Sequence, residues 1–592
     1  MHKCSGYIDL QNINGKCNTM PVLIILVFLL FLQGLSEDTP ENKNLFISPV
    51  RIPLSLSANF AELRADHFHS GIDIRTQGVI GKEIVAAADG YVYRISVSPG
   101  GFGKAIYLRH PSGYSTVYGH LDRFVTEVEE YVTDYQYQKK SFTVSIFPPK
   151  DKFPFRQGEI IAYSGNTGSS GGPHLHYEIR KSDSEIPVNP LLFEFGAGDD
   201  IEPILERLAI YPLSGNTRIN GVHAVKKINL AGGHGNYYIP TENEITISGP
   251  AGFGIKSYDL LNDSYNKCGI YSTELKIDGK TIFRNVMDEF SFNESRYINS
   301  HIDYETWIRE SIRFERTFLL PNNRLSTYQD IVNRGIYNFS EDRIYHVSLE
   351  LRDVHDNISV LAFKVKGSPA GAPDDSYTSE PGLVVMPYNR SNRFRAGNIA
   401  VSIPEGALYD TLMFRYRKEP SKNGMLSELH YVHDRATPLH KSYSLSIKPL
   451  AIPEGKESKL LIVNLRDDKT RIPLSGRYSE GFVNGQSSVF GAFYIGIDTV
   501  PPLVSAVGFS NGADLSGRQE MRIRISDNLS GIKSYEPFID GNWALFEYDQ
   551  KNRVLIYKFD PRRIKKGTNH SLTLKVSDNR DNITTFTTGF RW

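Results

Sequence analysis

The feature that most constrains the fold of this chain is the segment PHLHYEIR, which runs from Pro173 to Arg180. In an extended strand, successive side chains point to opposite faces. One face of such a strand would carry three apolar side chains: Leu175, Tyr177 and Ile179. The other face would carry four polar ones: His174, His176, Glu178 and Arg180. We therefore expect a sheet strand with a core on one side and a groove lined by imidazoles on the other.

Two histidines one residue apart do not identify a site by themselves, because a pair of surface histidines on a sheet has the same pattern. Candidate partners occur earlier in the chain, where His69 and Asp73 stand four residues apart in HSGID. A neutral imidazole and a carboxylate are good ligands for a borderline cation such as Zn²⁺; a hydrogen bond between them in a turn is the alternative. His120 lies in STVYGHL, on a predicted strand that places four side chains on one face: Tyr114, Thr116, Tyr118 and His120. For His120 alone, a hydrogen-bonded histidine near a sheet edge is the alternative.

The segments HSGID, YGHL and GPHLHYEI, in this order, resemble the lysostaphin-like (LytM-type) zinc metallopeptidases, a family of bacterial peptidoglycan endopeptidases. The resemblance implies that His69, Asp73 and His176 bind one Zn²⁺ per chain. It also implies that His120 and His174 are the catalytic pair, with a division of roles that the sequence leaves open.

This resemblance extends over residues 68–195. Three protein ligands would leave one zinc position open for water, and zinc lowers the pKa of such a water to about 7. An imidazole near neutrality can accept a proton from that water or donate a hydrogen bond to an oxyanion. The segment 124–155 is longer than the family's usual connection, so we expect an elaborated loop that rims the groove. His67 and His110 are interpreted as structural or groove-edge residues.

The sequence predicts a mainly β protein, with an N-terminal antiparallel β-sheet metallopeptidase domain followed by β-sandwich (Ig-like) domains. Beyond Asp200 histidines become rare, and alternating strand patterns separated by Gly, Asn and Asp take over. The expected divisions are a signal peptide (1–36), the metallopeptidase domain (37–200), a sandwich (201–370), a linker plus sandwich (371–500) and a C-terminal sandwich (501–592).

Two pairs of similar segments link the second and last of these units. Residues 245–259 resemble 523–537, and residues 348–359 resemble 571–584, in the same order. We therefore expect 201–370 and 501–592 to be two copies of one β-sandwich. The unit between them is expected to be a sandwich of a different type.

The N-terminus predicts export. Lys3 and Lys16 precede the apolar run PVLIILVFLLFL, and small residues lead to a plausible cleavage site after Ser36. An uncleaved signal anchor is the alternative. After cleavage only Cys268 would remain, so no internal disulfide is expected, nor a stable transmembrane segment. The expected location is the periplasm or cell envelope, with the external medium as a further option.

The predicted function is that of an exported zinc metalloendopeptidase, with peptidoglycan stem peptides and cross-bridges as substrate. Two alternatives stay open: a non-catalytic scaffold that activates other wall hydrolases, and an exported protease acting on proteins. The sandwich units are candidates for binding wall glycan or a partner protein. Equal numbers of basic and acidic residues, 67 each, and the lack of an aromatic-basic array argue against a nucleic-acid partner.

Overall fold

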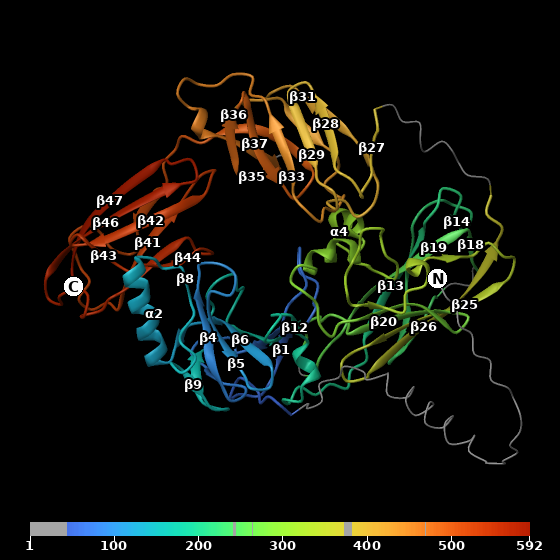
Figure 1. Ribbon diagram of the computed structural model, residues 1–592, viewed down its shortest axis with the longest axis horizontal. Helices are drawn as coiled ribbons and strands as arrows, with labels where there is room; N and C mark the ends of the chain where they lie inside the picture. The colour runs from blue at the N-terminus through green and yellow to red at the C-terminus, as the bar shows by residue number, and fades with distance from the viewer. Residues whose placement is uncertain (1–43, 241–243, 263, 372–381, 468) are drawn as a thin grey trace, which may run out of the picture. The chain divides into compact units, whose positions relative to one another are not determined.

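The computed structural model describes residues 44–240, 244–262, 264–371, 382–467 and 469–592; the predicted signal segment 1–36 lies outside this range. The described chain is mainly β and its sheets are almost entirely antiparallel, which confirms the predicted fold class (Figure 1). Within the described ranges, no helix combines the length and the apolar composition needed to cross a bilayer.

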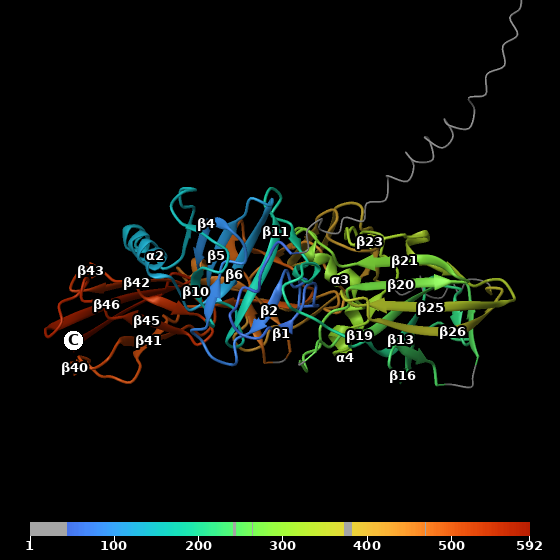
Figure 2. The same cartoon turned by 90° about the horizontal axis from the view of Figure 1, so that it is seen from below.

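A large sheet near the N-terminus carries the predicted site, and its strands follow the order β1-β2-β11-β6-β5-β4-β8. Their bounds are β1 Leu56–Ala58, β2 Ile72–Arg75, β4 Gly90–Val97, β5 Lys104–Arg109, β6 Tyr114–Leu121, β8 Val144–Ile146 and β11 His174–Lys181. Two short strands pair with inner strands of this sheet: β9 Pro154–Phe155 with β4 and β12 Pro187–Val188 with β11. A smaller sheet joins β3 Glu83–Val85, β10 Ile160–Tyr163 and β7 Arg123–Phe124. In Figure 2, β2, β11, β6, β5 and β4 can be followed across the large sheet.

The core of this region lies on one face of β11, as the alternation predicts. Leu175, Tyr177 and Ile179 are fully buried and belong to one apolar cluster. That cluster also takes in Ile84 of β3 and Ile161 of β10, so the smaller sheet shares the core of the large one. The other face of β11 is therefore left for the polar side chains.

The expected loop at 124–155 is instead built around a helix, α2 Thr126–Lys139. Val128, Val132 and Gln136 recur every four residues and are buried, so a helical stripe was present in the sequence and its tyrosines and lysines obscured it. Lys140 ends the helix in the left-handed conformation. The prediction of an elaborated loop was wrong for Thr126–Lys139, which form a helix.

The chain beyond residue 200 is β-rich and forms pairs of sheets around separate apolar clusters. In the first pair, one sheet contains β15 Lys226–Asn229, β13 Ile204–Pro212, β19 Pro250–Tyr258 and β22 Glu315–Arg316. Its partner follows β14 Arg218–Ile219, β18 Ile245–Ser248, β26 Ile358–Ser368, β25 Ile344–Arg352, β20 Ser272–Ile277, β21 Lys280–Val286 and β23 Tyr328–Gln329. Two short helices lie between β21 and β22: α3 Ile298–His301 and α4 Tyr304–Glu310.

The middle pair has one sheet of β28 Asn392–Ala396, β29 Ile399–Ile403, β33 Tyr443–Ile447, β37 Phe482–Ser487 and β36 Gly476–Ser479. Its other sheet has β31 Tyr416–Glu419, β32 Leu429–Val432, β38 Gly491–Ile497, β34 Leu460–Leu465 and β35 Arg471–Pro473. The last pair joins β39 Leu503–Ala506, β41 Glu520–Ser526, β45 Val554–Lys558 and β44 Glu547–Asp549 in one sheet. The other sheet holds β40 Ala513–Asp514, β47 Ile583–Arg591, β46 Asn569–Asp578, β42 Ile532–Ile539 and β43 Asn542–Trp543.

The two pairs of similar segments differ in whether their strands occupy equivalent places in the two units. Segments 348–359 and 571–584 occupy equivalent places, because each spans the turn of an antiparallel hairpin, β25–β26 and β46–β47. Segments 245–259 and 523–537 do not, since β18 runs parallel to β26 while β41 pairs with β39 and β45. The topological equivalent of β41 is β19, whose partner β13 corresponds to β39. The similarity of 348–359 to 571–584 therefore reflects equivalent hairpins. The similarity of 245–259 to 523–537 aligned strands that are not equivalent.

The region of the predicted site shares a second apolar cluster with the first β-rich unit. Phe60 and Phe68 pack with Met287 and Phe290, and the Ser295 hydroxyl accepts a hydrogen bond from the Phe68 amide. Phe68 directly precedes the predicted ligand His69, so these contacts with the first β-rich unit also hold the backbone next to that ligand. The expected division at residue 200 stays a prediction.

Candidate metal centre

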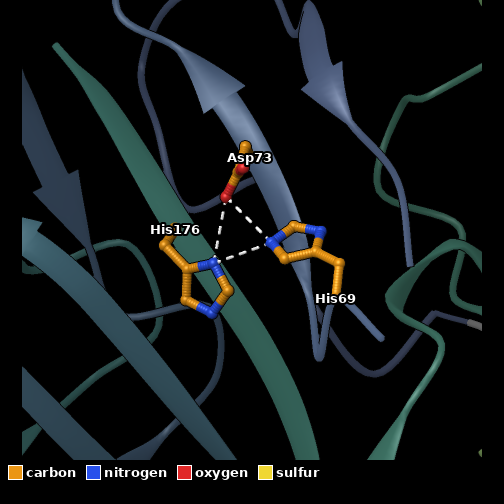
Figure 3. A group of neighbouring side chains, drawn as sticks. All are labelled: His69, Asp73 and His176. Atoms are coloured by element: carbon orange, nitrogen blue, oxygen red, sulfur yellow. Dashed lines mark hydrogen bonds and ion pairs between the residues drawn. The ribbon is translucent and has the colours of Figure 1, made fainter. Parts of the chain in front are cut away.

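Three predicted ligands converge on one point at the end of the large sheet (Figure 3). Asp73 Oδ1 lies 2.9 Å from His176 Nδ1 and 3.1 Å from His69 Nε2, and the two imidazole nitrogens are 3.1 Å apart. His176 of β11 is the direct cross-strand partner of Asp73 of β2, which places both side chains on the same face. Gly71 lets the chain pass close to β11, because a Cβ at this position would lie 2.3 Å from the Tyr177 carbonyl oxygen.

The atoms of these residues that face away from the centre are all bound. His69 Nδ1 donates to the Asn59 carbonyl oxygen at 2.7 Å, and His176 Nε2 donates to Glu178 Oε1 at 2.9 Å. Arg64 donates to Asp73 Oδ2 at 3.0 Å. These bonds fix the tautomers, so His69 Nε2, His176 Nδ1 and Asp73 Oδ1 face one another as lone-pair acceptors.

Three acceptors at about 3 Å repel one another unless a cation lies among them, and this arrangement fits a Zn²⁺ ligand set. Burial lowers the pKa of His69, which keeps it neutral as a ligand must be. Burial also acts to lower the pKa of His176, but its hydrogen bonds to Asp73 and Glu178 raise it to about 9. A proton and a metal ion compete for that nitrogen, so the negative environment that attracts one also attracts the other.

The two predicted catalytic histidines lie beside this centre. The ring centroids of His120 and His174 are 4.8 Å apart, and those of His120 and His176 are 5.9 Å apart. His120 Nδ1 donates to the Thr167 carbonyl oxygen at 2.9 Å, and His174 Nδ1 to the Gly172 carbonyl oxygen at 2.8 Å. Both rings therefore leave Nε2 available, and His174 Nε2 lies 3.5 Å from Asp73 Oδ1. The structure thus brings all five predicted side chains together.

His120 reaches the site by an unexpected route. Thr116 and Tyr118 face the core, where the two hydroxyls are 3.0 Å apart. Simple alternation would send His120 to that same face, as the sequence analysis assumed. Instead His120 has a φ of 59°, in the left-handed region, and its ring turns toward His174 and His176. Burial lowers its pKa to about 3, so the imidazole is neutral at physiological pH.

Several contributors were not foreseen. Glu178 was placed on the correct face of β11 but not assigned as the partner of His176, although the two-residue spacing was a sufficient signal. Its other oxygen accepts from Arg180 Nε at 2.6 Å, and both residues are buried, so this face of β11 is shielded from solvent beyond His176. Burial acts to raise the pKa of Glu178, but its contacts with Arg180 and His176 outweigh burial and lower the pKa to about 2. Asn59, which binds His69, and Arg64, which binds Asp73, lie outside any recognisable motif.

The remaining histidines of this region lie outside the cluster. His67 is exposed and bonds Asp66 at 2.8 Å, as expected for a residue at the edge. His110 is buried, with Nε2 2.8 Å from the Thr116 hydroxyl and Nδ1 2.9 Å from the Asp89 carbonyl oxygen. Both agree with their interpretation as structural or edge residues.

The loop beside His174 also contacts the last β-rich unit. Lys551 donates to Asn166 Oδ1 at 2.9 Å and to the Ser170 carbonyl oxygen at 3.0 Å. The Ser170 hydroxyl lies 3.2 Å from His174 Nδ1. Helix α2 makes a similar contact, with Tyr137 packed edge-on against Trp543 at 5.3 Å between centroids. The 124–155 segment therefore supports an interdomain contact.

Comparison with known proteins confirms the resemblance found in the sequence. The model of peptidase family M23 matches residues 67–137, and that of the Zu5-like domain matches residues 384–498. The N-terminal region is thus an M23-type domain. The Zu5-like match lies within 371–500, which was predicted to hold a linker plus a β-sandwich of a different type.

Relatives of known description share the same region. An uncharacterized metalloprotease of Haemophilus influenzae is 35% identical over 123 residues, which are 21% of this chain and 20% of the relative. The DD-carboxypeptidase/endopeptidase Mpg of Neisseria meningitidis is 36% identical, covering 21% of this chain and 22% of Mpg. The murein hydrolase activator NlpD of Escherichia coli is 30% identical, covering 21% and 26%. The chain therefore spans only about a fifth to a quarter of the length of these relatives.

Among solved structures, the catalytic domain of the prophage-encoded M23 protein EnpA of Enterococcus faecalis is 25% identical. The match covers 24% of this chain and 95% of that domain, with a TM-score of 0.19.

Proposed function

We propose that this chain is an exported, zinc-dependent endopeptidase that hydrolyses peptide cross-bridges of bacterial peptidoglycan. The observation that carries the proposal is the convergence of His69, Asp73 and His176 as three lone-pair donors, with His120 and His174 alongside. Relatives named as a DD-carboxypeptidase/endopeptidase and a murein hydrolase activator support the wall as the place of action.

The proposed chemistry divides between the metal and the chain. When bound, Zn²⁺ would supply Lewis acidity and an activated water near neutral pH. His120 and His174 each hold Nδ1–H on a backbone carbonyl oxygen and present Nε2 to the groove. Nε2 of a neutral imidazole can accept a proton, and the resulting imidazolium can return it to the leaving amine or hydrogen-bond an oxyanion. His120 and His174 have the same tautomer, so the tautomers do not assign the two residues separate roles.

The test is hydrolysis of purified sacculi by the full chain and by the variants His69→Ala and His174→Ala. Both variants should lose release of peptide fragments, because one removes a ligand and the other a proton acceptor. His67→Ala is the matched control, since His67 is an exposed histidine two residues from His69 and should leave activity unchanged. Full activity in both test variants would refute the endopeptidase proposal.

A scaffold that activates other wall hydrolases is the second candidate, favoured by the similarity to NlpD. The complete ligand set argues against it, because a scaffold has no need to retain three donors held by outer hydrogen bonds. Metal analysis distinguishes the two: the endopeptidase should contain stoichiometric zinc that is lost in His176→Ala. A full-length chain purified without bound zinc, and inactive when zinc is added, would favour the scaffold.

Protein substrates are the remaining alternative, since the same chemistry cleaves any amide that reaches the groove. Parallel digestion of sacculi and of casein or elastin decides between them, and we expect fragments from sacculi alone. The β-rich units are proposed to bind wall glycan or a partner protein. Their shared core with the M23-type domain means that this binding is best measured on the full, inactive His174→Ala chain.

A further inference from the structure

A second cluster of ligand-type side chains lies well away in sequence from the candidate metal centre. It joins Asp199, which precedes β13, Asp259 at the end of β19, and Asp353 with His355 in the turn between β25 and β26. One donor atom each of Asp199, Asp353 and His355 lies within 4.8 Å of the others. Asp259 and Asp353 are 2% and 3% exposed, so two carboxylates of the cluster are shielded from water.

Part of this cluster has an ordinary structural role. Asp353 Oδ1 accepts from the amides of His355 at 2.9 Å and Asn357 at 2.8 Å, and its Oδ2 accepts from the Asn357 side chain at 2.7 Å. Asp199 Oδ1 accepts from the amides of Ile201 and Asn262. These bonds stabilise the turn between β25 and β26 and the segment that precedes β13.

The other donor atoms have no such partner. Within the described residues, Asp199 Oδ2, Asp259 Oδ1 and His355 Nδ1 are buried without any hydrogen bond. His355 Nε2 donates to the Ala197 carbonyl oxygen at 2.7 Å, so Nδ1 carries a lone pair rather than a proton. Each of these three acceptor atoms is desolvated without a hydrogen-bond donor, which costs free energy unless a cation binds there.

The electrostatics point the same way. The carboxyl group of Asp259 interacts electrostatically with those of Asp353 and Asp199, which places it beside the three grouped residues. The cluster is therefore short of positive charge.

The last β-rich unit contains an equivalent cluster that differs in one respect. Asp498, Asp527 and Asp578 also bring donor atoms within 4.8 Å, at the matching places before β39, after β41 and at the end of β46. The turn bonds recur as well: Asp578 accepts from the Asn582 amide at 2.8 Å and side chain at 2.7 Å. At the position of His355 this unit has Arg580, whose charge acts on Asp498 and Asp578. The matching sequence position thus carries a guanidinium side chain in the last unit and an imidazole side chain in the first.

We propose that Asp199, Asp259, Asp353 and His355 form a binding site for one divalent cation at the entry of the first β-rich unit. A ligand set of mainly carboxylate oxygens with one imidazole nitrogen suits Mn²⁺. This cation is separate from the one at His69, Asp73 and His176, and it ties the chain leaving the M23-type domain to two turns of the following unit. The proposal does not depend on the proposed function.

The test measures Mn²⁺ binding to the full-length His176→Ala chain after EDTA treatment, so that the candidate catalytic centre lacks a ligand. We expect a bound equivalent of Mn²⁺ and a rise in the melting temperature on adding it. Adding Asp259→Asn or His355→Ala should remove that equivalent and the temperature rise. The matched control Asp527→Asn changes the equivalent residue beside Arg580 and should retain both.

The two variants also separate a metal site from a purely structural role. In metal-free protein, Asp259→Asn should melt at the same temperature as its parent or higher, because it removes a buried charge from an acidic cluster. If Asp259→Asn fails to fold, His355→Ala provides the same binding comparison. Equal Mn²⁺ binding by the parent, Asp259→Asn and His355→Ala, or no binding by the parent, would overturn the proposal. Loss of wall hydrolysis in His176→Ala has no bearing on this result, so the two proposals fail independently.

Discussion

The candidate metal centre and the acidic cluster at Asp199, Asp259 and Asp353 combine the same residue types in different proportions. The centre has two imidazoles and one carboxylate, with donor atoms 2.9–3.1 Å apart, and each atom that faces outward is hydrogen-bonded. The acidic cluster has one imidazole and three carboxylates, with donor atoms spread over up to 4.8 Å for the three residues grouped. In the candidate metal centre, outer hydrogen bonds fix the orientation of the ligand atoms. In the acidic cluster, the net negative charge would attract the proposed cation.

The largest effect should come from removing a ligand at the centre. His176→Ala takes away a donor that lies about 3 Å from each of the other two, and it also frees Glu178 from its partner. We expect hydrolysis of sacculi to fall to the rate of the enzyme-free blank and bound zinc to fall below one equivalent per chain. Measurable turnover with normal zinc content would show that the three donors do not act as one ligand set.

A smaller effect should follow from changing an outer partner. Glu178→Gln keeps the shape of the side chain but removes the charge that holds both His176 and Arg180. Zinc affinity, measured by competition with a chelator, should weaken by about 10–100-fold. Glu185→Gln is the control, because Glu185 also contacts Arg180 at 3.1 Å but is partly exposed and does not touch His176. Equal weakening in both variants would assign the effect to Arg180 and not to His176.

A third effect, on stability, should come from Asn59, which links the M23-type domain to the first β-rich unit. The Asn59 side chain donates to the Gly269 carbonyl oxygen and accepts from its amide, both at 2.8 Å, while the Asn59 carbonyl oxygen holds His69. Asn59→Ala leaves two partly buried backbone groups unpaired, which should lower the free energy of unfolding by about 1–3 kcal/mol in urea titrations. The backbone bond to His69 remains, so zinc content should persist; its loss would show that the Gly269 contact also positions the ligand.

The smallest effect should come from Lys551→Ala. Lys551 contacts the loop beside His174 but neither the ligands nor the catalytic histidines, and its partner Asn166 is near the surface. Exposed polar contacts contribute about 0–1 kcal/mol, which corresponds to at most a roughly fivefold change in kcat/KM. A loss larger than that of Glu178→Gln would mean that the last β-rich unit controls the groove more strongly than the outer hydrogen bonds do.

Local sequence pattern predicted more of the site than of its surroundings. The alternation in PHLHYEIR correctly placed Leu175 in the core and His176 on the opposite face beside Asp73, because two-residue periodicity is a property of any strand. The same reasoning put His120 on the wrong face, since the left-handed backbone at that residue has no signal in the sequence. Helix α2 was missed although its buried stripe was visible in the sequence.

The sequence by itself determined which side chains are available for chemistry, the strand that presents two of them and the mainly β class of the chain. Only the tertiary structure decided which atoms meet: the Asn59 carbonyl on His69, Arg64 on Asp73, and Asp199 near Asp353 across a long stretch of chain. The physical reason is that strand alternation is local, whereas the tautomer of an imidazole and the charge around a carboxylate depend on neighbours brought together by sheet register and packing.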